Sequence, residues 1–126
     1  MNETNMNPGT WDIKQRCYNF SLEMLKLVRT LPNDLVSRTT GGQLIRSATS
    51  VGANVIEAQA GSSKRDFANY LNIALKSANE SKYWLNLLRD GGIGEGKSVE
   101  TLEVEVKQLA KILGSSLVTI NKQKNK

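Results

Sequence analysis

The phosphate-loop pattern G-x-x-x-x-G-K-[ST] is matched letter for letter by the residues from Gly91 to Ser98. In such a loop the backbone N–H groups wrap a nucleotide's phosphates, the lysine neutralises them, and the hydroxyl binds Mg²⁺. The loop has to lie between a buried strand and a helix. Here it follows WLNLLRD, which is typical of a helix end, and no apolar strand ending in Asp offers a second magnesium ligand. We therefore disfavour a nucleotide-using enzyme and interpret the stretch as a helix C-cap, a glycine turn and a new N-cap at Ser98.

Few other residues could support catalysis or bind a metal. The chain has no histidine, which removes the commonest general base and the commonest metal ligand. Glu80 stands among apolar residues on a helical wheel, and a carboxylate in such surroundings could act as an acid. No second catalytic group accompanies it, so an ion pair with Arg46 or Arg16 is the better interpretation. We expect no enzymatic activity, no metal site and no cofactor.

Composition describes a small, basic, helical protein. The length of 126 residues suits one domain, and the net charge of +5 favours anionic partners, with nucleic acid first among them. Helix formers dominate, and no alternating apolar pattern predicts a strand. The single cysteine, Cys17, cannot form an internal disulfide, and neither a membrane span nor a signal peptide is recognisable. These features predict a cytoplasmic protein without membrane contact.

Helical periodicity divides the chain into four amphipathic segments, which we expect at residues 11–31, 40–61, 64–90 and 98–121. Pro32 ends the first segment, Thr40 and Gln43 form a capping box for the second, and Ser63 caps the third. Because the connections are short, consecutive helices should run antiparallel. The sequence therefore predicts an all-α, up-and-down antiparallel four-helix bundle over residues 11–121, with a flexible arm at 1–10 and a basic tail at 122–126.

The segment from Leu44 to Gly61 carries only two charges, so we expect other helices to cover most of it. One stripe is apolar and belongs to the core, and Gly61 should end the helix in a left-handed conformation. A second stripe is small and polar, and we expect it to meet another helix, either of the same chain or of a neighbouring subunit. The polar residues that we expect to be buried or interfacial, and not catalytic, are Arg46, Ser47, Ser50, Asn54, Glu57 and Glu80.

The first and third helices have a second apolar patch beyond their inward seam. Tyr18, Leu22 and Leu25 form the patch of the first helix, and Ile73, Trp84 and Leu87 form that of the third. Outer helices of a monomeric bundle do not need such patches, which indicates contact with other subunits. The fourth helix is conventionally amphipathic. Its far side is expected to hold Glu100, Glu103, Lys107 and Lys111, with Glu103 and Lys107 spaced for an ion pair.

One set of residues between Gln43 and Glu80 is similar to a known family. Its parts are Gln43-Leu44-Ile45-Arg46-Ser47-Ala48-Thr49-Ser50-Val51, Ala53-Asn54-Val55-Ile56-Glu57-Ala58, Asp66-Phe67, Leu71, Ile73-Ala74, Ser77-Ala78 and Glu80. Through these residues the chain resembles, over about residues 11–121, the bacterial four-helix-bundle family encoded in intervening sequences of 23S rRNA genes. The resemblance implies a homopentameric ring. A related branch, the accessory variability protein of diversity-generating retroelements, is basic and pentameric and works with a reverse transcriptase and nucleic acid.

Two functional hypotheses remain. The leading one is a non-enzymatic oligomer that binds RNA or DNA, or a nucleoprotein partner, through repeated basic patches with little sequence preference. The candidate contacts are Lys64, Arg65, Lys76, Lys122, Lys124 and Lys126, and a second group of Lys14, Arg16, Lys26 and Arg29. The alternative is a protein-interaction scaffold that docks a partner such as a reverse transcriptase without touching nucleic acid itself.

Overall fold

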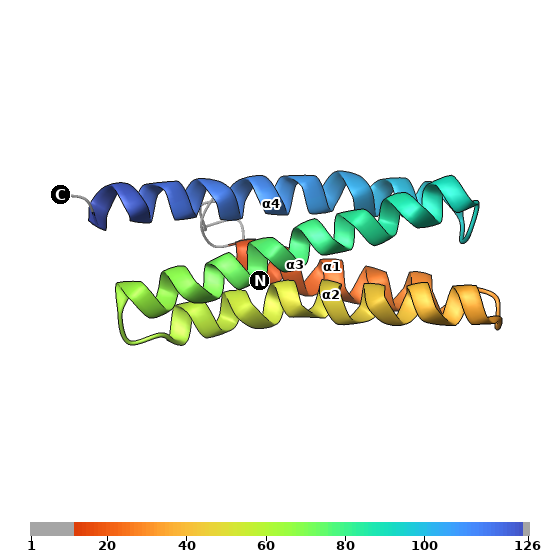
Figure 1. The fold of residues 1–126 in the computed structure, drawn as a ribbon, viewed down its shortest axis with the longest axis horizontal. Coiled ribbons are helices and arrows are strands. Elements are labelled where there is room, and N and C mark those ends of the chain that lie inside the picture. Colours follow the sequence, from red (N-terminus) through yellow and green to blue (C-terminus); the bar gives the residue numbers. More distant parts are fainter. Residues whose placement is uncertain (1–11, 125–126) are drawn as a thin grey trace, which may run out of the picture.

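The computed structural model describes residues 12–124, and this part of the chain forms four helices and no strand. They are α1 (Asp12–Arg29), α2 (Leu35–Ala60), α3 (Lys64–Gly91) and α4 (Gly96–Lys124). Consecutive helices run antiparallel (Figure 1), and both α1 and α3 pack on α2 and α4. α1 and α3 therefore occupy diagonal corners. The expected all-α, up-and-down four-helix bundle is confirmed.

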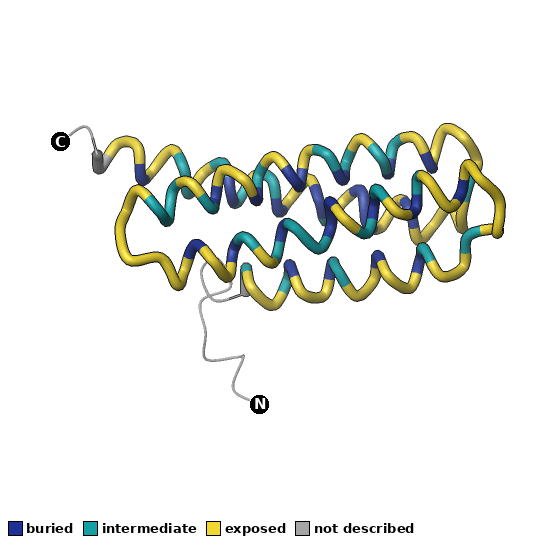
Figure 2. The backbone as a smooth tube through the Cα atoms, turned by 60° about the horizontal axis from the view of Figure 1, so that its bottom comes forward, coloured by how far each residue is buried: buried dark blue, intermediate teal, exposed yellow. Residues whose placement is uncertain are grey.

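The core is made from one buried stripe of each helix, and these stripes face one another along the bundle (Figure 2). In α1 the buried stripe runs from Cys17 to Leu27, as its helical spacing predicts. In the other three helices the largest fully buried aliphatic side chains are Leu44, Leu85, Leu88, Leu109 and Leu113. Each fully buried leucine stabilises the fold by about 1.5–3 kcal/mol relative to an exposed one.

The second helix begins earlier than predicted, at Leu35 and not at Thr40. Asp34, in an extended conformation, accepts the N–H of Ser37 through its carboxylate at 2.8 Å and so caps the helix. Thr40 does not cap; its hydroxyl donates to the carbonyl of Val36 at 2.7 Å. The prediction was wrong because Thr40 and Gln43 have the spacing of a capping box but lie inside the helix, whereas Asp34 supplies the cap.

Two glycines of α2 lie where α1 approaches most closely. A Cβ atom on Gly41 would lie 3.0 Å from Val28 Cγ1, and one on Gly52 would lie 3.2 Å from Cys17 Cβ. These positions leave no room for a larger side chain without moving a neighbour. Glycine here serves close helix packing and does not mark a turn.

The polar stripe of α2 packs against α3 of the same chain. Ser47 and Ser81 are buried and share a hydrogen bond of 2.9 Å, and Ser50 and Ser77 share one of 2.8 Å. Asn54 donates to the backbone oxygen and to the hydroxyl of Ser50, at 2.8 and 3.0 Å. The partner helix that the sequence predicted is thus intramolecular for these residues. Small hydroxyl side chains let the two helices approach closely while their polar atoms stay paired.

Two helix ends differ from expectation. Gly61 ends α2 in an extended conformation, with φ −66°, and not in the left-handed one. α4 continues to Lys124, so the residues 122–124 of the expected tail are helical; no proline or glycine stops the helix, and lysines suit the negative end of its dipole. The expected arm at 1–10 lies outside the described residues. In the described part of the chain, no helix is long and apolar enough to cross a membrane.

Candidate nucleic-acid interface

Three cations from distant parts of the sequence lie at the same end of the bundle. The connection between α2 and α3 and the last turns of α4 lie at the same end (Figure 1). Lys64 and Arg65 open α3 there, and Lys122 lies in the last turns of α4; all three side chains are exposed. Within residues 12–124 none of the three forms a salt bridge with a described side chain. We call these three residues the basic end.

The local structure fixes the basic end by ordinary helix capping. Ser63 is extended, and its hydroxyl accepts the N–H of Asp66 at 3.1 Å, as the sequence predicts. This cap starts α3 at Lys64, so two cations occupy its first turn. The antiparallel α4 then brings Lys122 back to the same end. Of the other predicted tail contacts, Lys124 is the last residue of α4, and Lys126 lies outside the described residues.

The remaining predicted cations do not join the basic end. Lys76 is exposed midway along α3, and Lys14 is exposed near the start of α1. Lys26 and Arg29 lie in the last turn of α1, near the opposite end of the bundle, where Lys26 pairs with Glu23 at 3.2 Å. The described candidates therefore lie at several places on the bundle, and three of them share the basic end.

Arg16 is partly buried, and its side chain is hydrogen-bonded to α4. Its guanidinium forms two hydrogen bonds with the carboxylate of Glu105, at 2.7 and 3.0 Å, and a third with Gln108 at 2.6 Å. Two parallel hydrogen bonds to one carboxylate require the planar guanidinium of an arginine and fix its orientation. Arg16 therefore joins α1 to α4, and we assign it a structural role in place of the predicted phosphate contact.

Glu80 finds one of its two predicted partners. Its Oε2 lies 2.8 Å from a guanidinium nitrogen of Arg46, and accepts the indole N–H of Trp84 at 3.1 Å. Arg46 also donates to Gln43. This network links α2 to α3 on the outer surface, where Arg46 and Glu57 are exposed within the subunit. Burial of these two residues would require a second subunit.

One buried charge was missed. Glu103 is only 8% exposed, and Arg89 donates to its Oε2 at 2.8 Å from the neighbouring α3. The predicted position of Glu103 on the far side and its pairing with Lys107 were both wrong. Spacing along one helix does not reveal a partner on another, and the cross-helix pair here compensates the buried carboxylate.

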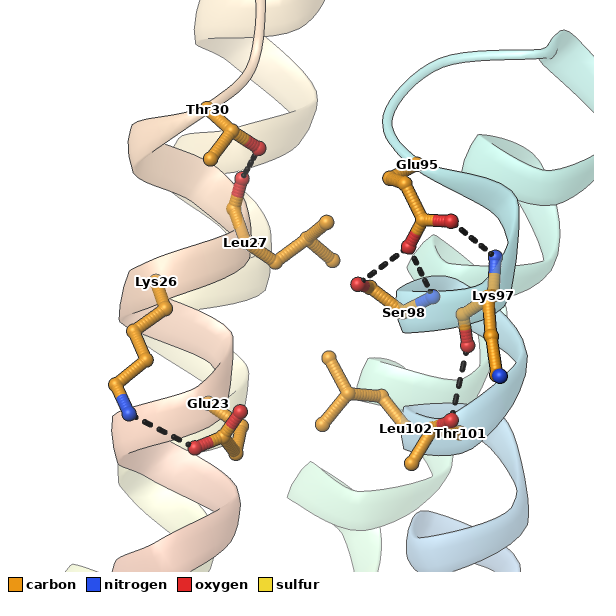
Figure 3. Close-up of a pocket in the computed structure, with 9 residues that line it drawn as sticks. All are labelled: Glu23, Lys26, Leu27, Thr30, Glu95, Lys97, Ser98, Thr101 and Leu102. Atoms are coloured by element: carbon orange, nitrogen blue, oxygen red, sulfur yellow. Dashed lines mark hydrogen bonds and ion pairs between the residues drawn. The ribbon is translucent and has the colours of Figure 1, made fainter.

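The residues that match the phosphate-loop pattern form a helix-to-helix turn. Gly92, with φ 66°, caps α3, and α4 begins at Gly96. Glu95 caps α4 (Figure 3): its carboxylate accepts the Ser98 N–H at 2.7 Å, the Ser98 hydroxyl at 2.6 Å and the Lys97 N–H at 3.2 Å. Ser98 was predicted as the cap and is the donor to it. The Lys97 and Ser98 N–H groups and the Ser98 hydroxyl, which a phosphate loop would direct at its nucleotide, are therefore used within the turn.

The cap makes the stability of α4 depend on pH. Hydrogen bonds from the Ser98 side chain, the Ser98 backbone and the Lys97 backbone hold the pKa of Glu95 below its ordinary value. Stability from a carboxylate with a lowered pKa is present above the unfolded pKa and is lost as the pH falls through the folded one. Between about pH 5 and about pH 3, we expect the melting temperature to fall less steeply in Glu95→Gln than in the wild type. Glu57→Gln, on exposed α2 surface, is the control; equal slopes for both variants would contradict the cap's role.

A cleft of about 510 Å³ lies between α1 and the start of α4 and is drawn in Figure 3. Its rim carries Glu23, Lys26, Glu95 and Lys97, and Leu27 and Leu102 point into it. The charges of opposite sign are interspersed, and Glu23 and Lys26 pair with each other. This cleft therefore does not concentrate charge of one sign, in contrast to the basic end.

Comparison with known proteins identifies the family of this chain but assigns it no biochemical activity. The family model described as 23S rRNA-intervening sequence protein matches residues 10–115. The crystal structure of a protein of unknown function from the S23 ribosomal protein family of Bacteroides thetaiotaomicron is similar, with a TM-score of 0.74 and 37% identity, over 83% of this chain and 94% of that one. No curated protein matches. Since the family model covers most of the bundle, this chain belongs to the 23S rRNA-intervening sequence protein family.

Proposed function

We propose that this chain is a non-enzymatic, ring-forming bundle that binds nucleic acid through the basic end of each subunit. The observation that carries the proposal is that Lys64, Arg65 and Lys122 lie at the same end of the bundle and form no salt bridge to a described side chain. Lysine and arginine side chains held in this way neutralise phosphates without reading bases. The matched crystal structure is named as a member of a ribosomal protein family, which favours RNA as the first ligand to test.

The exposed apolar residues favour a ring. We call Tyr18, Leu22 and Leu25 the α1 face, and Ile73, Trp84 and Leu87 the α3 face; all but the partly buried Trp84 are exposed. The α1 face borders α2 at Ile45, and the α3 face is linked to α2 through the Arg46–Glu80–Trp84 network, so the two faces flank α2 on either side. An interface between two different faces is heterologous, and such an interface generates a ring when the rotation between subunits closes and a filament when it does not. We propose a pentamer, the stoichiometry that the family resemblance implies.

A ring multiplies weak contacts. Each basic end supplies only a few phosphate contacts, but subunits that are tied together bind a long strand with a high effective concentration. Affinity should therefore be strongly dependent on salt and nearly independent of sequence. Nucleic acid of mixed sequence, in single-stranded RNA and duplex DNA forms, would be bound with comparable salt dependence.

Charge reversal at the basic end tests this proposal. We expect the variant Lys64→Glu, Arg65→Glu, Lys122→Glu to lose at least about tenfold in affinity for single-stranded RNA near 0.1 M salt, with a log-log salt slope that is shallower by about 0.7 per lost phosphate contact. Fluorescence anisotropy over a salt series measures both quantities. The control is Lys107→Glu, Lys111→Glu, which reverses two exposed lysines in the middle of α4.

The result can contradict the proposal in two ways. A wild-type protein that binds no nucleic acid even at low salt would refute it. So would an equal loss of binding in the control variant, because net charge alone would then explain the effect. Native mass spectrometry establishes in parallel that both variants keep the subunit count of the wild type.

A protein-interaction scaffold is the second candidate, and the α3 face favours it. Ile73 and Leu87 are exposed beside the Arg46–Glu80–Trp84 network, which gives an apolar surface with a polar centre. Protein-binding surfaces commonly combine these features. A polymerase partner that is still captured by the charge-reversed variant would favour the scaffold, whereas capture lost together with nucleic acid would favour the basic end.

A further inference from the structure

Large apolar side chains are exposed at the end of the bundle opposite to the basic end. The connection between α1 and α2 and the connection between α3 and α4 both lie at that end (Figure 1). Leu35 and Val36, the first two residues of α2, are 71% and 58% exposed. Pro32 is exposed just before them, and the partly buried Ile93 comes from the other connection. We call these four residues the apolar tip.

A hollow of about 500 Å³ lies between the two connections, and all four residues of the apolar tip line it. The other lining residues are Asp34, Ser37, Gly92 and Gly94. No atom lies within 4 Å of a Cβ built on Gly92, so the space in front of this turn is open. One small surface therefore carries exposed apolar side chains and a recess next to them.

A surface that has side chains and a recess next to each other can pair with a second copy of itself. In a contact with two-fold symmetry both copies use the same surface, so every contact between them occurs twice. Leu35 and Val36 of one copy then enter the hollow of the other copy, and the symmetry supplies the reverse contact. Apolar side chains that are exposed in the single subunit leave water in this contact, which favours it.

The charges beside the apolar tip allow such pairing, whereas those of the basic end oppose it. Asp34 lines the hollow, Arg38 lies one turn further along α2, and Arg89 pairs with Asp90 at 2.9 Å just before Gly92. Two copies that meet here bring acids and bases together. Two basic ends that met would place cations against cations, which repel each other. An anionic membrane would likewise attract the basic end and not the tip.

We propose that two copies of this chain pair through the apolar tip with two-fold symmetry, so that their basic ends point away from each other. The tip is small, and small interfaces are weak when they act alone, so single subunits pair only at high protein concentration. A ring carries all of its tips at the same height along its axis, so several contacts form together and two rings pair more strongly. The tip belongs to neither the α1 face nor the α3 face, so the pairing is separate from ring formation and from nucleic-acid binding.

Native mass spectrometry of a tip variant over a series of protein concentrations tests the proposal. Leu35→Glu, Val36→Glu sets the glutamates of two copies against each other, and we expect it to halve the subunit count of the wild type. The first turn of α2 contains no acidic residue, and glutamates there interact favourably with the helix dipole, so the variant should fold. The matched control, Val104→Glu, Val118→Glu, adds the same charge at exposed valines of α4 and should keep the wild-type count.

The ring and the tip contact give separate results in this experiment. If the ring forms, two rings in the wild type become one ring in the tip variant; if it does not, dimers become monomers. The ratio of the two counts therefore tests the tip, and the absolute count tests the ring. Equal counts for the wild type and the tip variant at every concentration would overturn the proposal, and so would an equal loss in the control. Flotation of the wild type, but not of the tip variant, with neutral phosphatidylcholine vesicles at equal subunit counts would assign the tip to lipid instead and overturn it as well.

Discussion

Gly52→Leu is expected to lower the free energy of unfolding by about 1–3 kcal/mol, because it overpacks the contact between α1 and α2. A Cβ at position 52 would lie 3.2 Å from Cys17 Cβ and 3.6 Å from the Cys17 carbonyl carbon. The tight contact is with the Cβ atom of Cys17, which is bonded directly to the α1 backbone and cannot rotate away as a flexible side-chain end does. The two helices must therefore separate, and the fully buried Cys17 would lose its packing. Urea unfolding followed by circular dichroism measures the change.

Gly42 supplies the matched control in the same helix. It is exposed, and no atom lies within 4 Å of a Cβ built there. Replacing glycine by leucine at such a site removes the entropic cost of glycine in a helix and should stabilise the protein by about 0.5–1 kcal/mol. The two substitutions are thus expected to have opposite signs. Effects of the same sign would mean that the helix packing at Gly52 is looser than the structure shows.

Single glutamates on the two apolar faces are expected to convert the proposed ring into monomers. Leu25→Glu places a charge on the α1 face and Leu87→Glu places one on the α3 face, both at exposed positions of the subunit. Burying an unpaired carboxylate in an interface costs several kcal/mol, so association should weaken on the order of 100-fold or more. Val104→Glu and Val118→Glu, at exposed positions of α4 outside both faces, are the controls and should still assemble.

Mixing the two variants identifies the kind of interface. Each variant keeps one intact face, so a heterologous interface predicts that an equimolar mixture of Leu25→Glu and Leu87→Glu forms heterodimers and nothing larger. Native mass spectrometry distinguishes the two chains by mass. Monomers in the mixture, or wild-type assembly in both single variants, would contradict pairing of the α1 face with the α3 face. Thermal melts confirm that each variant keeps the bundle fold.

Much of the fold could be predicted because its signals are local. The recurrence of Cys17, Phe20 and Met24 at helical spacing reports which side of α1 is buried, whatever that side packs against. Short connections then leave antiparallel neighbours as the natural arrangement. The pair of Arg46 with Glu80 could be foreseen because an acid among apolar residues needs a cation.

The missed features depend on the relative placement of helices. Glu103 looks like a surface residue until α3 places Arg89 against it. The serines of α2 were expected to meet another helix, and only the structure shows that this helix is α3 of the same chain, through Ser77 and Ser81. At Glu95 the difficulty was different. The sequence contains several residues able to cap α4, and only the backbone geometry of the turn decides that Glu95 accepts the N–H of Ser98.

The sequential packing of the helices has a consequence for folding kinetics. Apart from the contact of α1 with α4, every helix-helix interface joins neighbours in the chain, and the interface of α2 with α3 is the most extensive. A chain of such low contact order should fold within microseconds to milliseconds. We expect the α2–α3 hairpin to form the folding nucleus, so Ser81→Ala should slow folding, whereas a change at Arg16 should mainly speed unfolding. The seam between the first and last helices would be the last to close and the first to open.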